Sequence, residues 1–271
     1  MFLGRNRPVL ARNRAYSCIR MYAVTYRHRC QRLPWLFLSG IVINVPPVGD
    51  FDAMNRERLN QNISTIRKYT AAHAELRAAH HFLYDLPLKR DTKIPEVVVM
   101  GINPGETEFD RDAYPGPTEE TWNFDFHERS RLGRSKGSVR WHNYAEYFAN
   151  GRPLVMTELF FWSSRNNAEF EERFGLLEVS PHLQFCMNLN RSLIDEYQPK
   201  SIIFPGVGKT QVVAKKFGLR HVDTLCDGGK RLVLHYRDES RPWYFTQHWT
   251  SAWGLSNTDK DDIRKYIDQS S

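Results

Sequence analysis

Pro95-Glu96-Val97-Val98-Val99-Met100 is an almost continuous apolar run, with three β-branched residues in succession. A run without polar alternation suits a strand that is covered on both faces of a sheet. Similar runs follow at 154–156, 201–204, 231–234 and 243–246, and helical stretches separate or follow them near 141–149, 180–197, 209–217 and 258–268. Strands that alternate with helices predict a three-layer α/β domain with a mainly parallel sheet.

Upstream of this pattern, the chain is punctuated at Pro46-Pro47-Val48-Gly49. Residues 55–86 contain no Gly or Pro and favour one long helix or two shorter ones. Residues 1–49 carry eight Arg and no Lys, Asp or Glu, a composition like that of a transit peptide. We favour a poorly ordered extension, with Met54 as an alternative start. The expected division is an extension, 1–53, and a single α/β domain, 54–271.

The composition is that of an ordinary globular protein, with 271 residues, 41% hydrophobic and 25% charged. The four cysteines form no CxxC pair, so their spacing predicts no metal site. Scattered thiols favour a reducing, cytoplasmic setting. The apolar stretch 33–45 is shorter than the roughly 20 residues of a membrane span, so we expect no membrane partner.

The net charge of +7 comes from the extension, because residues 50–271 hold 30 basic and 31 acidic side chains. Any electrostatic attraction of the domain to nucleic acid must therefore come from a local patch. Residues 127–142 carry five basic groups and one acidic group, interleaved with Ser and Gly. Such a segment is typical of a loop that contacts a phosphate backbone, although many charged runs are merely solvated.

The first strand leads directly into Gly101-Ile102-Asn103-Pro104-Gly105. Pro104 biases Asn103 toward an extended conformation, and the glycines remove side-chain bulk on either side. The pattern therefore places an amide at the carboxyl end of a buried strand, where open α/β sheets bind ligands. A tight turn without function is the alternative interpretation.

The pentapeptide resembles the first motif of the uracil-DNA glycosylase superfamily, especially its mismatch-specific and single-strand-selective branches. Segment 154–159 lies where that family places a base-recognition residue, segment 201–206 resembles the turn before a late helix, and segment 245–251 resembles the closing motif. The resemblance covers about residues 90–256. It implies a central sheet of four mainly parallel strands and an enzyme of DNA repair that works without a cofactor.

The implied reaction is hydrolysis of an N-glycosidic bond on a flipped-out nucleotide, with removal of uracil or a related base. Asn103 would orient the attacking water, and His248 would donate a hydrogen bond to the departing base. The residues that would bind the substrate are Gly101, Ile102, Pro104, Gly105, Tyr114, Glu158, Thr250 and Ser251. The residues that would bind DNA are Arg131, Arg134, Lys136, Trp253 and Leu255.

Within these sets, the resemblance implies that Tyr114 stacks on the extruded base and that Trp253 or Leu255 fills the gap left in the duplex. Two positions differ from the family pattern. Glu158 stands where an Asn is common, and Trp249-Thr250 follows His248 where the family has Pro-Ser. These differences leave the preferred base open. We expect a monomer that binds DNA.

Two other functions remain open at this point. Gly206-Val207-Gly208-Lys209-Thr210 resembles the end of a P-loop, but the full pattern needs a Gly at 203, where this chain has Ile203. An NTPase is therefore the weaker alternative. The stronger alternative is a binding module for nucleic acid or nucleotides that has the same fold without glycosylase activity.

Overall fold

The computed structural model describes residues 48–77, 79, 86–87, 94–105, 136–249 and 255–271. All of them belong to one compact unit, Pro46–Ser271. The first helix begins at Val48, before the expected boundary at 54. Met54 lies inside this helix, so a chain that started there would lack its first turn.

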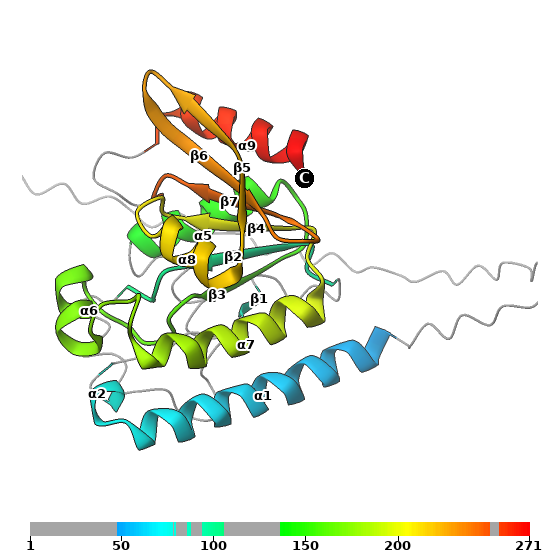
Figure 1. Cartoon of the computed structure of the whole chain (residues 1–271). Coiled ribbons are helices and arrows are strands. Elements are labelled where there is room, and N and C mark those ends of the chain that lie inside the picture. Colours follow the sequence, from blue (N-terminus) through cyan, green and yellow to red (C-terminus); the bar gives the residue numbers. More distant parts are fainter. Residues whose placement is uncertain (1–47, 78, 80–85, 88–93, 106–135, 250–254) are drawn as a thin grey trace, which may run out of the picture. The chain divides into compact units, whose positions relative to one another are not determined.

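A single sheet forms the centre of the described unit (Figure 1). Its strand order is β1-β3-β2-β4-β7-β6-β5. The strands are β1 (Leu86–Pro87), β2 (Val97–Gly101), β3 (Leu154–Glu158), β4 (Ser201–Pro205), β5 (Arg220–Asp227), β6 (Lys230–Arg237) and β7 (Pro242–Thr246). The predicted apolar runs all became strands, and β2, β4 and β7 are buried along their whole length.

The expected number of four strands is wrong, because the sheet has seven. β3, β2, β4 and β7 pair in parallel, whereas β1, β6 and β5 join antiparallel. The β5–β6 hairpin turns at Gly228-Gly229, where both residues have positive φ (52° and 80°). Two glycines adopt such angles without steric cost, so the chain reverses tightly and adds two strands beyond β7.

Helices cover both faces of the sheet, as the sequence predicted (Figure 1). α5 and α9 pack together on one side, where Tyr147 donates to Asp261 and Asn150 to Asp268. α7 lies on the other side, and α1 runs along it (Figure 1), with Tyr69 stacked on Phe185. The helices are α1 (Val48–Ala72), α2 (Ala74–Arg77), α5 (Lys136–Ala149), α6 (Asn167–Phe174), α7 (Pro181–Tyr197), α8 (Thr210–Phe217) and α9 (Asn257–Ser270).

Helix ends follow local signals in the sequence. α7 has Ser180 as its N-cap and Pro181 in its first turn, and α8 ends at Gly218 in a left-handed conformation. α6 was not predicted. It is capped by the side chain of Asn166, which accepts from the backbone N–H of Glu169.

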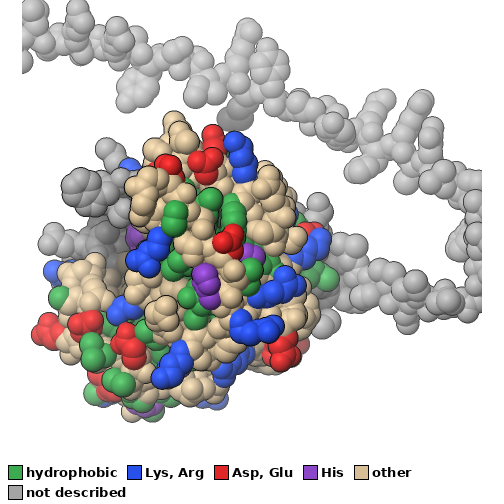
Figure 2. Space-filling view, turned by 45° about the horizontal axis from the view of Figure 1, so that its top comes forward, with side chains coloured by type: hydrophobic (Ala, Val, Ile, Leu, Met, Phe, Trp, Pro, Cys, Tyr) green, Lys and Arg blue, Asp and Glu red, His purple; other side chains and the backbone are tan. Residues whose placement is uncertain are grey.

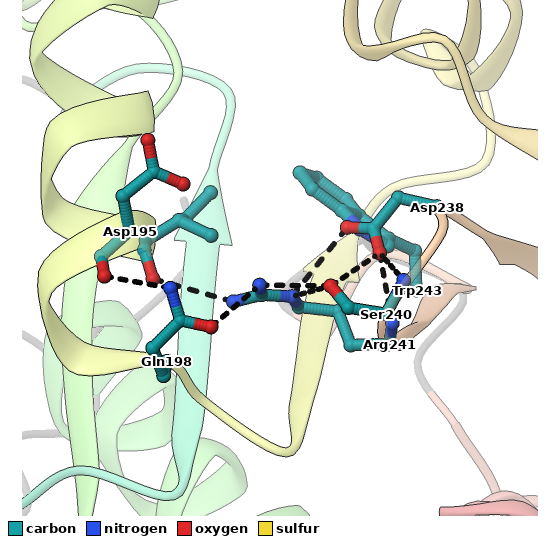
Figure 3. A network of polar contacts seen from close by, with 7 residues as sticks. Asp195, Gln198, Asp238, Ser240, Arg241 and Trp243 are labelled. Carbon is teal, nitrogen blue, oxygen red and sulfur yellow. Dashed lines mark hydrogen bonds and ion pairs between the residues drawn. The ribbon is translucent and has the colours of Figure 1, made fainter.

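A buried arginine ties the amino-terminal edge of the parallel strands together (Figure 3). Arg241 precedes β7 and reaches the end of α7, where it donates to the carbonyl oxygen of Ile194 at 3.3 Å and to Gln198 Oε1 at 3.2 Å. Its Nε lies 3.6 Å from Asp238 Oδ2. Because each end of the guanidinium group has partners, a charge can be buried here without being left uncompensated.

Asp238 completes this network. Its Oδ1 accepts from the backbone N–H groups of Ser240 and Arg241, both at 2.8 Å, and its Oδ2 accepts from Trp243 Nε1 at 2.9 Å. Burial opposes ionisation of Asp238, but these hydrogen bonds outweigh it and hold its pKa below the usual value. The network joins the β6–β7 turn to α7.

Candidate active site

The carboxyl ends of four parallel strands meet at one edge of the sheet. After β2 the chain moves to β3, which lies on one side of β2. After β4 it moves to the strands on the other side, β5, β6 and finally β7, which pairs with β4. The segments that leave β2 and β4 therefore diverge, which creates a topological switch point between these two strands. The two segments adjoin there, because a Cβ added to Gly206 would lie 3.6 Å from Ile102 Cδ1. Open α/β sheets bind ligands at such points.

The segment 101–105 at this switch point is not an isolated turn. It extends β2 alongside the chain that follows β3: the N–H of Leu159 bonds the carbonyl of Gly101 at 2.8 Å, and the N–H of Phe160 bonds that of Ile102 at 2.9 Å. The N–H of Ser164 then bonds the carbonyl of Pro104 at 3.2 Å. The backbone around Asn103 is thus held on one side by the segment that follows β3.

The side chain of Asn103 is fixed through its amide nitrogen. Nδ2 donates to Ser164 Oγ at 2.8 Å, and to the carbonyl oxygens of Pro104 at 3.2 Å and Trp162 at 3.5 Å. Carbonyl oxygens can only accept, so this end of the amide must be the nitrogen. Among the described residues, Oδ1 at the other end of the amide has no hydrogen-bond partner. Ser164 and Trp162 carried no signal in the sequence.

Trp162 connects this arrangement to α1. Its side chain is buried, and its Nε1 donates to Thr70 Oγ1 at 2.9 Å. Its carbonyl oxygen is one of the acceptors of Asn103 Nδ2. Trp162 therefore links the side-chain amide of Asn103 to α1, the helix that packs against α7.

Glu158 ends β3 and pairs in register with Gly101 of β2. A Cβ on Gly101 would overlap its carboxyl group, so only glycine leaves room for this side chain. Glu158 is 8% exposed, and its Oε2 is buried without a hydrogen-bond partner among the described residues. Burial raises its pKa to about 8. Its backbone is held by α7, where Asn190 Nδ2 donates to the carbonyl oxygen of Glu158 at 2.9 Å.

His248 follows β7 at the same edge of the sheet. Its ring centroid lies 6.1 Å from that of Trp141 on α5. Part of the ring is exposed, and desolvation of the remainder lowers its pKa, which favours the neutral form at neutral pH. The next residue, Trp249, is fully buried and donates from Nε1 to Thr246 Oγ1 at 2.9 Å. This anchor fixes the backbone beside His248.

The order of the strands places β4 between β2 and β7. Neighbouring strands are about 4.8 Å apart, so the ends that carry Asn103 and His248 are separated by roughly 10 Å across the edge. The structure thus brings Asn103, Glu158 and His248 to one edge, on the ends of three parallel strands.

The groups that would serve a P-loop are engaged elsewhere. Lys209 Nζ lies 3.7 Å from Glu178 Oε1, and the hydroxyl of Thr210 donates to the carbonyl oxygen of Val207 at 2.9 Å. Ile203, at the position that needs glycine, lies inside β4 and pairs with Val99 and Tyr244. In this conformation, the side chains of Lys209 and Thr210 contact other groups of the protein and not a phosphate group or its magnesium ion.

Several predicted site residues lie outside the described residues: Tyr114, Arg131, Arg134, Thr250, Ser251 and Trp253. Lys136 is the first residue of α5, and only its backbone is described. Leu255 is described, and it is 7% exposed within the hydrophobic core. A side chain in that position cannot fill a gap in a duplex unless it leaves the core, so this role would fall to Trp253.

The described surface shows no continuous basic patch on the face drawn in Figure 2, where Lys and Arg side chains are interspersed with Asp and Glu. Within the described ranges, no group of three or more His, Cys, Asp and Glu side chains is arranged to hold a metal ion. The same ranges contain no helix that is both long and apolar enough to cross a membrane. Comparison of the chain with models of protein families and with curated proteins finds no match.

Proposed function

We propose that the protein is a hydrolase that cleaves the N-glycosidic bond of a nucleotide extruded from DNA and releases uracil or a related base. The observation that carries this proposal is the fixed amide of Asn103 at the switch point of the sheet. Because an amide is too weak a base to take a proton from water, its role is to hold water in line with the bond. Fixing Nδ2 inward leaves Oδ1 to do so.

His248 supports the proposal from the other side of the edge. A departing base carries negative charge, and a hydrogen-bond donor directed at it lowers the barrier to bond breaking. The lowered pKa keeps the imidazole neutral, and a neutral ring still donates one N–H. The ring of Trp141 lies beside that of His248, and the buried Trp249 holds the backbone next to it, which supports this role.

The direct test is release of base from labelled oligonucleotides that contain uracil, mismatched or damaged bases, single-stranded and duplex. Single-turnover rates at saturating enzyme report the chemical step without contributions from DNA affinity. We expect release of at least one base, and a loss of about 10²–10³ in rate for His248→Ala. His221→Ala is the matched control, because His221 is an exposed histidine on β5.

Base release, oligonucleotide binding and ATP hydrolysis, measured on the same protein, separate the alternatives. A chain that binds the oligonucleotides and releases nothing from the whole panel is a binding module of this fold. Magnesium-dependent ATP hydrolysis that Lys209→Ala abolishes would instead establish an NTPase. We expect neither result.

A further inference from the structure

Two aromatic side chains of α5 gather beside His248. The ring centroid of Trp141 lies 6.1 Å from that of His248 and 5.0 Å from that of Trp249. Tyr144 lies one turn further along α5, with its ring centroid 6.1 Å from that of Trp249. Trp249 is fully buried, whereas Trp141 and Tyr144 pack against the core and keep part of their surface exposed to solvent. A half-exposed ring on a buried support has an aromatic surface that a planar ligand can cover.

The topology places these rings at the carboxyl-terminal edge of the parallel strands. α5 ends at Ala149 and leads through a short turn into β3, so the helix runs back over the sheet in the direction opposite to the strand. The beginning of α5 therefore lies at the edge where β3 ends, and the contact of Trp141 with His248 agrees with this position. The two rings belong to the rim of the candidate site.

Three cationic side chains accompany the rings. Arg140 is exposed and directly precedes the tryptophan on α5. Lys260 comes from α9, and its Nζ lies 5.6 Å from the centroid of the Tyr144 ring. Arg231 comes from β6 and is exposed, and its carbonyl oxygen accepts from Gln247 Nε2 at 2.7 Å, next to the histidine. Three elements thus each bring one cation to the same rim.

The charge of these cations is not neutralised by the described part of the chain. None of the three forms an ion pair with a described acidic side chain. The acidic groups through which α9 contacts its neighbours have other partners: Asp259 Oδ2 lies 2.9 Å from Lys230 Nζ, and Asp261 accepts from the hydroxyl of Tyr147. A group of uncompensated cations favours an anionic ligand.

Aromatic rings that alternate with cations are the groups that bind a single strand of nucleic acid. Each unpaired base has a planar face that stacks on an aromatic side chain, and cations neutralise the phosphates between successive bases. A base inside a duplex is covered by its neighbours and has to leave the stack before it can use such a ring. An acidic peptide would use the cations but supplies no regular series of planar groups for the rings.

Resting on the glycosylase function proposed above, we propose that Trp141 stacks on an unpaired base next to the extruded nucleotide, and that Arg140, Arg231 and Lys260 contact the phosphates of that strand. The strand ends that carry Asn103 and His248 would hold the extruded nucleotide itself. Trp141 belongs to a helix outside this row, so its ring meets the neighbouring base. The protein should therefore bind DNA more tightly where the strand beside the target is unpaired.

The test measures the affinity of the full chain for a labelled oligothymidylate, which contains no uracil, and for a blunt duplex. Trp141→Leu removes the aromatic face and should weaken binding of the single strand by about 5- to 150-fold, the effect of losing one base–aromatic stack. Trp141→Phe keeps an aromatic face and should lose less than about threefold. Binding of the duplex should be the same for all three proteins, and urea unfolding checks that each variant is folded.

Phe217→Leu is the matched control. Phe217 on α8 is also a partly buried aromatic residue with a cation above its ring, because the guanidinium group of Arg191 lies 5.5 Å from the ring centroid. It precedes β5 at the opposite end of the sheet, so its substitution should leave binding of the single strand unchanged.

The cations are tested through the salt dependence of the same affinity. Arg140→Gln, Arg231→Gln and Lys260→Gln should each flatten the slope of log affinity against log salt by about 0.7, the value for one phosphate contact on a single strand. Arg237→Gln, at an exposed position at the other end of β6, should not change the slope.

Three results would overturn the surface: a wild type that does not bind the single strand, a Trp141→Leu variant that binds it as the wild type does, or an equal loss of affinity for single strand and duplex. The failure of the glycosylase function has a different signature. If no oligonucleotide releases a base while binding of the single strand still depends on Trp141, the surface stands and the proposed reaction is wrong.

Discussion

Asp238 and Glu158 are carboxyl groups at opposite edges of the same sheet, and their environments shift their pKa values in opposite directions. At the amino-terminal edge, hydrogen bonds from Trp243, Ser240 and Arg241 overcome burial and keep Asp238 ionised. At the carboxyl-terminal edge, burial acts alone on Glu158 and raises its pKa. At the first edge, the carboxyl group of Asp238 has its hydrogen-bond partners within the fold. At the second edge, one carboxyl oxygen of Glu158 has no hydrogen-bond partner among the described residues.

This comparison predicts that the two edges divide stability and chemistry between them. Substitutions at the Arg241 network should reduce the free energy of unfolding and leave the rate per folded molecule unchanged. Substitutions at the Asn103 site should do the opposite. Active sites often store such destabilising arrangements, which the rest of the fold offsets.

The largest effect is expected for Arg241→Ala. The substitution removes hydrogen bonds to Ile194 and Gln198 and leaves Asp238 partly buried without its cation. Breaking one partner of a buried ion pair costs about 3–5 kcal/mol, measured here by urea unfolding. Arg237→Ala, at an exposed position of β6, is the control and should change stability by less than about 0.5 kcal/mol. Comparable losses for the two variants would contradict the network's role.

Asn103→Ala tests the other edge. Loss of the amide should lower the single-turnover rate of base release by about 10²–10³, the usual effect of removing one positioned group. Stability should change little, because Asn103 is only partly buried and the variant keeps the backbone hydrogen bonds that pair 101–105 with the chain after β3. If this variant releases base at the wild-type rate, the segment 101–105 serves only to connect β2, and the binding-module interpretation takes over.

Ser164→Ala should have a smaller effect of the same kind. Of the three hydrogen bonds that Asn103 Nδ2 donates, the one to Ser164 Oγ is the shortest. The two carbonyl acceptors, of Pro104 and Trp162, remain in the variant. One hydrogen bond contributes about 0.5–1.5 kcal/mol, so the rate should fall by about two- to twelvefold. The same variant made in an Asn103→Ala background should show no further loss. An additive loss in the double variant would mean that Ser164 acts on the substrate and not through Asn103.

Lys209→Ala should have the smallest effect. Its ion pair with Glu178 is long and partly exposed, and such pairs contribute about 0–1 kcal/mol. Base release should remain within twofold of the wild type, and stability within about 1 kcal/mol. A loss of nucleotide binding, measured by calorimetry with ATP and magnesium, would show that the segment after β4 has the function of a P-loop.

The sequence predicted the buried parts of the fold well, because burial leaves a compositional signal. β2, β4 and β7 are buried along their whole length, and each was expected. β5 was missed for the opposite reason. Its residues Arg220–Asp227 are mostly exposed and polar, and the strand exists because β6 pairs with it. The start of α6 does carry a signal in the sequence, because Asn166 is followed three residues later by Glu169, as at many helix N-termini. The search for apolar runs did not detect it.

The candidate site was predictable only in part. Asn103 could be found because Pro104 and two glycines mark it in the sequence, and Glu158 only through the resemblance of segment 154–159 to a family motif. Ser164 and Trp162 come from a segment with no regular period, and only the pairing of 101–105 with the chain after β3 brings them to Asn103. The raised pKa of Glu158 comes from its burial, and its close approach to Gly101 is not recorded in any sequence pattern.

Trp162 makes the outside of the molecule sensitive to events at the site. Its indole N–H is held by Thr70 on α1, and its carbonyl oxygen by Asn103. Under the proposed function, a ligand that immobilises Asn103 should also strengthen the docking of α1, because coupling between two sites acts equally in both directions. Binding of a ligand should then change two properties away from the site: the protection of α1 from proteases and the environment of the Trp162 indole.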